Sequence, residues 1–110
     1  MFGNKEKKLE KMVEKKNAAG IIKLINDKDA AIALKAVASL GKVPGDDAYN
    51  ALISLIRSPK AEIRAAAVTA LAEMGSPKAK AHIDHMLTGE KDAAVIAALK
   101  SAQAKIHGKE

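Results

Sequence analysis

The sequence has 110 residues, with 19 Lys and Arg, 13 Asp and Glu, three His and no Cys, which gives a formal net charge of +6. This length suits one domain, and the absence of Cys excludes a disulfide scaffold, a zinc site with thiolate ligands and a cysteine nucleophile. Ala supplies 23 residues, aromatic residues supply only 2%, and no apolar run approaches the ~20 residues of a membrane span, so closely packed helices are expected.

The N-terminal segment predicts a basic helix over residues 5–16. Residues 1–28 hold eight Lys and four acidic residues, so most of the positive charge lies at this end. The segment lacks the apolar stretch of about 7–15 residues that a secretory signal requires, which favours a cytoplasmic location. Because three Glu residues are interleaved with the Lys residues, a solvated helix face is the favoured interpretation. The alternative is binding to nucleic acid or another anionic surface through Lys5, Lys7, Lys8, Lys11, Lys15 and Lys16.

The rest of the chain repeats with a period of 31 residues. Ile21, Leu52 and Ile83 coincide under this shift, and each is followed by apolar residues at the third and fourth positions, which marks one face of a helix. A second apolar set, from Ile32 to Val43, recurs in the later units with one extra residue before its last copy. Each unit is therefore predicted to consist of two helices. The expected helices after the first span residues 18–26, 29–43, 46–57, 59–74, 77–88 and 91–106.

Capping signals agree with these boundaries. Polar side chains that can accept a hydrogen bond from the first helical turn precede most of the predicted helices. The candidate N-cap residues are Asn17, Asp29 or Asp92, Asp46, and the Ser of the pairs Ser58-Pro59 and Ser76-Pro77. Gly75 and the segment 42–45 are expected to end the two long helices that precede them.

Polar residues at both ends of the repeat predict solvent-facing caps. A two-helix unit cannot bury its own apolar face, so stacked units share one core and the outermost units need polar outer faces. In the last unit, Asp84, Lys100 and Gln103 replace aliphatic residues of the inner units, and an unpaired charge would be costly to bury there. In the first helix, Lys5 and Glu6 are likewise expected on the outer face.

The sequence thus predicts an all-α fold, a short α-solenoid of about three two-helix repeats with an extra N-terminal capping helix. In this interpretation all 110 residues form a single domain. Its parts are the capping helix at residues 1–16 and the repeats at residues 17–44, 45–75 and 76–107.

The segment Ile63–Pro77 resembles the HEAT-repeat family, in the short-unit form similar to the repeats of phycobilisome lyases. Its sequence, IRAAAVTALAEMGSP, is similar to that family's pattern of an aliphatic residue, Arg, an Ala-rich stretch, Leu, an aliphatic residue, Gly and a turn with Pro. The likeness covers about residues 17–107. Arg64 is the family Arg, whereas Ala33 and Ile96 occupy the matching positions of the other units. The resemblance implies an α-solenoid that binds proteins along the surface formed by the second helices.

No group of residues in the sequence predicts a catalytic, metal or cofactor site, so the protein is not expected to be an enzyme. His82 and His85 lie three residues apart, a spacing that can present two metal ligands on one helix face. The repeat register places His85 on the solvent side, so a surface His beside a partly packed His is the favoured interpretation. The seven Gly residues never cluster as a phosphate-binding loop.

The face of the second helices that points away from the core predicts a partner-binding surface. Its side chains are small and weakly apolar with little charge, which suits a peptide or an amphipathic helix better than phosphates. The alternative for Val37 and Val68 is packing between adjacent units, and Arg64 is expected to be structural or to lie at the groove edge. The candidate residues are Leu34, Val37, Ala38, Arg64, Ala65, Val68, Thr69, Ala97 and Lys100.

Three functions follow from these observations, in order of preference. The first is a monomeric, non-catalytic scaffold or adaptor that binds an unidentified protein or peptide. The second is the nucleic-acid or anionic-surface binder described for the first helix. The third, an accessory protein of a tetrapyrrole lyase, follows only from the lyase-like repeats, and the scarcity of aromatic residues counts against it.

Overall fold

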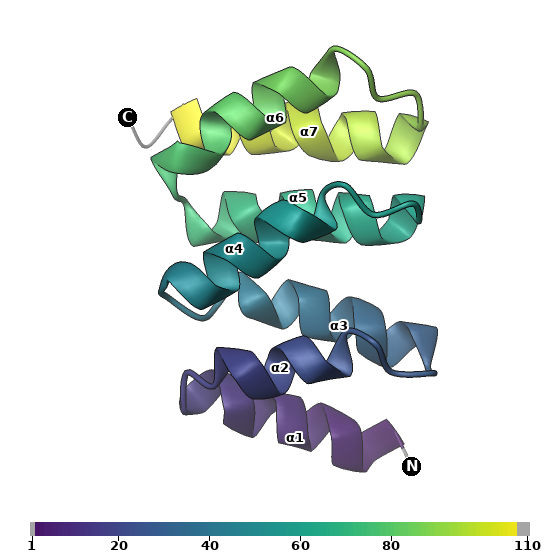
Figure 1. Cartoon of the computed structure of the whole chain (residues 1–110), viewed down its shortest axis with the longest axis vertical. Coiled ribbons are helices and arrows are strands. Elements are labelled where there is room, and N and C mark those ends of the chain that lie inside the picture. The colour runs from purple at the N-terminus through teal and green to yellow at the C-terminus, as the bar shows by residue number, and fades with distance from the viewer. Residues whose placement is uncertain (1, 108–110) are drawn as a thin grey trace.

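The computed structural model describes residues 2–107, and every regular element in this range is helical (Figure 1). The elements are α1 (Phe2–Glu14), α2 (Ala18–Leu24), α3 (Ala30–Leu40), α4 (Asp46–Leu55), α5 (Ala61–Met74), the 3-10 turn η1 (Pro77–Ala79), α6 (Lys80–Leu87) and α7 (Ala93–His107). The all-α prediction and the order of the predicted helices are confirmed. No helix within residues 2–107 combines the length and the apolar composition that a membrane span requires.

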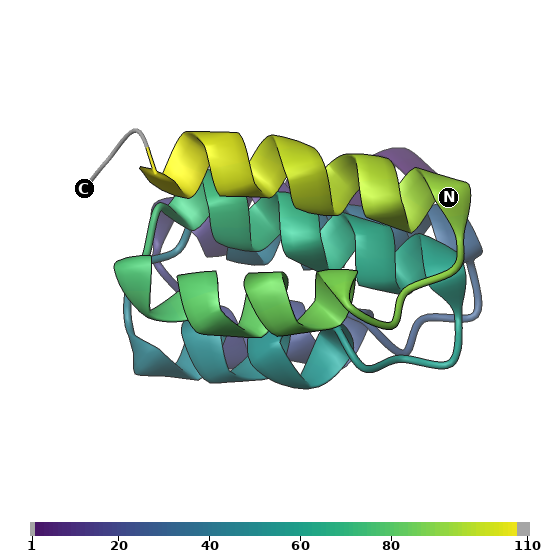
Figure 2. The same ribbon diagram turned by 90° about the horizontal axis from the view of Figure 1, so that it is seen from above.

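The helices stack in two layers, which Figure 2 shows from above. One layer holds α1, α3, α5 and α7, here called the second-helix layer, and the other holds α2, α4 and α6. Within the second-helix layer, α1 packs on α3, α3 on α5 and α5 on α7. The stack measures 39 × 27 × 17 Å. The predicted short α-solenoid is confirmed, with α1 as a lone second helix at its N-terminal end.

The apolar residues of the 31-residue register form the core of this stack. Ile21, Leu52 and Ile83 occupy equivalent positions in α2, α4 and α6, and all three are fully buried. Leu40 of α3 and Leu71 of α5 are buried in the same cluster. Each such side chain contributes about 1.5–3 kcal/mol when it is removed from water. Because neighbouring units share this core, each unit depends on the next one to bury its apolar face.

Three helices begin with the side-chain caps that the sequence predicted. The Asn17 side chain accepts a hydrogen bond from the Gly20 backbone N–H at 3.0 Å. The Asp29 carboxylate accepts one from the Ala31 N–H at 2.9 Å. The Asp92 carboxylate accepts two from the first turn of α7, at 3.0 and 3.1 Å. Both Asp29 and Asp92 therefore serve as caps, where the sequence left the choice between them open.

The other predicted starts differ in detail. Gly45 precedes α4 with a φ of 111°, a conformation that favours glycine, so Asp46 lies inside the first turn and does not cap it. The Ser58 hydroxyl accepts a hydrogen bond from the Lys60 N–H at 3.1 Å, which closes a turn before α5 begins. Pro77 opens η1, but the Ser76 side chain makes no capping hydrogen bond.

Gly41 lets the end of α3 approach α5 closely. A Cβ atom at this position would lie 2.7 Å from the Ala70 carbonyl oxygen and 3.1 Å from the Ala70 Cβ. Both neighbours are held by the α5 backbone and cannot move aside cheaply. The missing side chain of Gly41 thus brings neighbouring units into direct backbone contact.

The C-terminal end of the stack has the polar cap that the sequence predicted. Lys100 is exposed, and Gln103 and Asp84 are half-buried. The Gln103 side-chain amide donates to Asp84 Oδ1 at 2.7 Å, and Lys80 Nζ donates to Asp84 Oδ2 at 3.2 Å. Gln103 and Asp84 are therefore hydrogen-bonded to each other, and Lys100 is open to water.

The N-terminal end differs from the prediction for Lys5 and Glu6. Both residues reach toward the following unit and not outward. Lys5 Nζ lies 2.8 Å from Asp27 Oδ2, and Lys35 Nζ lies 2.8 Å from Glu6 Oε1. The register explains the error, because the counterparts of these positions in α3 face the next unit. The outer face of α1 is instead formed by other exposed Lys and Glu residues.

Candidate partner-binding surface

The solvent side of the second-helix layer carries most of the residues predicted for partner binding. Ala38, Thr69 and Ala97 are exposed on α3, α5 and α7, and Leu34 and Ala65 are half-buried beside them. These five residues repeat along the three adjacent helices with the period of the units. We call them the second-helix surface. None of the five side chains is charged and all except that of Leu34 are small, so these positions offer apolar contact.

Val37 and Val68 do not belong to this surface. Both are fully buried, and both lie in the core cluster. The contact of α3 with α5, and of α5 with α7, places the next helix of the layer over each Val. Their assignment as partner contacts is therefore wrong, and the alternative, packing between adjacent units, is what the structure shows.

Lys100 is exposed on α7, three residues after Ala97. It occupies the register position of the two buried Val residues, which point toward the following unit. After α7 no further unit follows within residues 2–107, so this position faces the end of the stack. Lys100 thus lies where the second-helix surface meets the C-terminal end of the stack, and its role as a partner contact stays a prediction.

A hollow of about 370 Å³ borders the second-helix surface at Ala38, between α1 and α3. Leu9 and Val13 of α1 supply apolar atoms to its lining, together with Ala38. Its charged lining residues are acidic on the side of α1 and basic on the side of α3. They are Glu6 and Glu10 on the α1 side and Lys35 and Lys42 on the α3 side.

Arg64 takes part in an ion pair between units. Its Nε donates to Glu90 Oε1 at 3.0 Å and its Nη2 donates to Glu90 Oε2 at 2.9 Å, which is the two-point geometry favoured by guanidinium and carboxylate. The Nη1 group donates to the Ser58 carbonyl at 3.0 Å. The Arg64 and Glu90 side chains are only 21% and 7% exposed. Of the two roles expected for Arg64, the structure shows the structural one.

Glu90 belongs to a repeated loop position that also includes Asp27 and Ser58. Each of the three accepts a hydrogen bond from the backbone N–H two residues further on, at 2.9–3.1 Å. Asp27 and Glu90 also bind a cation from the preceding second helix, Lys5 and Arg64 respectively. The repeat register aligns these three loop residues in the sequence. It does not align their cationic partners, because Lys5 and Arg64 occupy different positions in their helices.

These ion pairs predict an acid-sensitive contribution to stability. The hydrogen bond from Arg64 lowers the pKa of Glu90, although burial opposes this shift. A carboxyl group with a lowered pKa in the folded state stabilises the fold above its unfolded pKa and loses this effect as the pH falls. Arg64→Met removes this hydrogen bond. We therefore expect the urea midpoint of Arg64→Met to fall less than that of the parent chain between about pH 7 and about pH 3.

The control for this prediction is Lys91→Met, which removes an exposed positive charge beside the same loop. It should leave the pH profile of the urea midpoint close to that of the parent chain. Equal acid sensitivity of the parent and Arg64→Met would show that the Arg64–Glu90 pair does not carry the effect.

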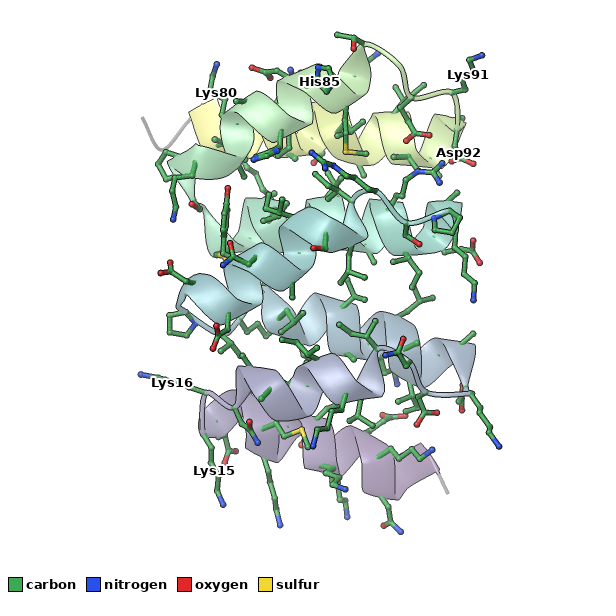
Figure 3. The ribbon with its side chains drawn as sticks, viewed as in Figure 1. Lys15, Lys16, Lys80, His85, Lys91 and Asp92 are labelled. Atoms are coloured by element: carbon green, nitrogen blue, oxygen red, sulfur yellow. The ribbon has the colours of Figure 1, made fainter. Side chains whose placement is uncertain are left out.

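The Lys residues predicted as an alternative anion-binding site lie on α1 and the turn after it. Lys7, Lys8, Lys11, Lys15 and Lys16 are exposed, whereas Lys5 is engaged with Asp27. Figure 3 shows Lys15 and Lys16 extending from the turn between α1 and α2. Exposed Glu10 and Glu14 share this helix with them. The result is a mixed-charge face, which suits phosphates less well than a surface of clustered Lys and Arg.

The two His residues of α6 follow the expected pattern of exposure. His85 is exposed at the end of the stack (Figure 3). His82 is half-buried. Within residues 2–107 no group of three or more His, Asp or Glu side chains is arranged to hold a metal ion.

Comparison with known proteins adds one finding to this geometry. A family model described as HEAT repeats matches residues 18–103. The match runs from the start of α2 into α7 and leaves α1 outside. A search of the curated proteins finds no match for the chain.

Proposed function

Because the chain belongs to the HEAT-repeat family, we propose that it is a non-catalytic scaffold or adaptor that binds a protein or peptide partner on the second-helix surface. HEAT repeats are typically protein-interaction scaffolds. The observation that carries the proposal is the row of exposed small side chains, Ala38, Thr69 and Ala97, on adjacent parallel helices. The short side chains at these positions leave room for a partner helix, and exposed Lys35, Lys42 and Glu73, one turn away, place charges at its flanks.

The chemistry of this surface favours a protein partner over a nucleic acid. Its five residues carry no charge, whereas phosphate recognition uses Lys, Arg and oriented backbone N–H groups. The neighbouring hollow between α1 and α3 offers apolar atoms from Leu9 and Val13 with charges of both signs around them. This combination fits the apolar face and polar flanks of an amphipathic helix.

The test is a charge introduced at the centre of the second-helix surface. Thr69→Glu should lower the affinity for a partner purified from the native host by at least about tenfold, because a carboxylate would be desolvated in the contact. Affinity is measured by isothermal titration calorimetry, with circular dichroism to verify the helical fold. Ser54→Glu is the matched control, since Ser54 is exposed on α4 in the opposite layer. Unchanged binding by Thr69→Glu would remove this surface from the proposal.

The other functions expected from the sequence gain no specific support from the structure. The anion-binding alternative would use a helix whose exposed Lys residues are mixed with Glu. An accessory role in tetrapyrrole attachment rests on the lyase-like resemblance alone. A monomeric state and a cytoplasmic location belong to our proposal and stay predictions.

A further inference from the structure

At three places in the stack a second helix lies beside the loop between the two helices of the next unit. We call these places junctions, and the side chains that occupy them differ. At the first junction, Lys5 reaches Asp27, and at the last, Arg64 reaches Glu90. At the middle junction, Ala33 stands in the register position of Arg64, and Ser58 stands in the position of Glu90. Neither residue is charged and both are short, so no side chain spans this junction as Arg64 spans the next one.

A hollow of about 550 Å³ occupies the middle junction. Its lining comes from the loop that joins α2 to α3, from the loop that joins α4 to α5 and from the helix ends beside them. Figure 1 shows these two loops at the same edge of the stack. Apolar side chains from four helix ends line much of it, namely Ile25, Leu34, Leu55 and Ile63, beside Ala33 and Pro59. This lining suits an aliphatic or aromatic side chain of a partner.

The charges around this hollow favour an acidic partner. Lys28 and Lys60 both line it and both are exposed, whereas Glu62 is the exposed acidic residue on the lining. The remaining acidic residue of the lining, Asp27, already accepts hydrogen bonds from Lys5 and from the Asp29 N–H. With Asp27 paired to Lys5, two Lys residues stand against Glu62, so a partner carboxylate beside an apolar group meets net positive charge, whereas a cationic side chain meets one carboxylate and two like charges.

We propose that the middle junction is a docking site for a short acidic and hydrophobic segment of a partner protein. One aliphatic or aromatic side chain enters the hollow, and flanking Asp or Glu residues lie against Lys28 and Lys60. The site deepens the proposed scaffold function, on which it rests, because Leu34 borders both the hollow and the second-helix surface. Thr69, in contrast, does not line the hollow, which allows the two proposals to be tested separately.

The experiment selects peptides from a displayed library of random 12-residue sequences on the full chain. The expected result is enrichment of sequences in which an aliphatic or aromatic residue stands beside two or more Asp or Glu. Absence of enrichment, or enrichment of basic or uncharged sequences, would overturn the proposal. A synthetic copy of the most enriched peptide is then titrated by fluorescence anisotropy.

The decisive variant fills the hollow from within. Ala33→Arg combined with Ser58→Glu copies the Arg64–Glu90 arrangement at the middle junction and should weaken peptide binding at least tenfold. A second variant, Lys28→Glu with Lys60→Glu, changes only exposed side chains and should weaken the same peptide at least tenfold, so it decides the question if the first variant does not fold. Undiminished binding by a folded variant of either kind would refute the site.

The matched control is Ser54→Glu, which adds a carboxylate at an exposed position of α4 that does not line the hollow, and it should bind the peptide as the parent chain does. If Thr69→Glu loses the natural partner and the hollow variants keep the peptide, the scaffold proposal stands and the docking site is wrong. If the hollow variants lose the peptide and Thr69→Glu keeps the natural partner, the docking site stands and the second-helix surface is wrong.

Discussion

Replacing Val68 with Lys is expected to lower the free energy of unfolding by about 3–5 kcal/mol, because the ammonium group would be left unpaired in the core. Val68 is fully buried on α5, with α7 packed against that helix. At the equivalent position of α7 the chain carries Lys100, which is exposed. Lys is thus accepted on α7, after which no further helix follows within residues 2–107, and is expected to be rejected on α5, which α7 covers.

The measurement is urea denaturation followed by circular dichroism, with the midpoint and slope compared between variants. Thr69→Lys is the matched control, since it introduces the same charge one residue further along α5 at an exposed position. Its effect should stay within about 0.5 kcal/mol. A Val68→Lys variant as stable as the control would mean that α7 does not cover this face of α5 in solution.

The sequence predicts the helices well because their signals are local and repeated. The 31-residue period aligns Ile21, Leu52 and Ile83, and all three are buried. Caps such as Asn17 and Asp29 act within one helical turn, so their partners lie a few residues away in the sequence. Burial and capping that depend on helical spacing alone can be inferred without knowing how the units pack.

The candidate site is harder to predict because it depends on which helix faces a neighbour covers. Helical spacing places Val37 and Val68 beside Ala38 and Thr69, but only the packing of the next unit separates the buried pair from the exposed pair. The same ambiguity explains the misplaced Glu6, which faces α3. The hollow at the middle junction depends on side chains from two loops and four helix ends, so no single stretch of sequence reveals it.

The C-terminal cap leads to a second prediction, about self-association. Lys100 and Gln103 stand at the register positions of Val68 and Leu71, both of which are buried because a further helix packs over α5. If the polar cap prevents stacking, restoring the aliphatic residues with Lys100→Val and Gln103→Leu should create an apolar end face. Two such faces can meet across a two-fold axis, which is the commonest symmetry of protein dimers.

We expect the Lys100→Val/Gln103→Leu variant to dimerise with a dissociation constant in the range of about 10–100 µM, because the restored apolar contact is small and association costs translational and rotational freedom. Sedimentation velocity over a concentration series measures this. The matched control is Ser101→Val with Lys105→Leu, which adds similar aliphatic side chains at exposed positions of α7 outside the cap. Dimerisation of both variants would indicate nonspecific association through added apolar side chains. Dimerisation of neither would show that Lys100 and Gln103 are not what prevents association at this end face. Gln103→Leu also removes the hydrogen bond from the Gln103 amide to Asp84 Oδ1, and Lys80, which donates to Asp84 Oδ2 in the parent chain, is left to pair with this carboxylate.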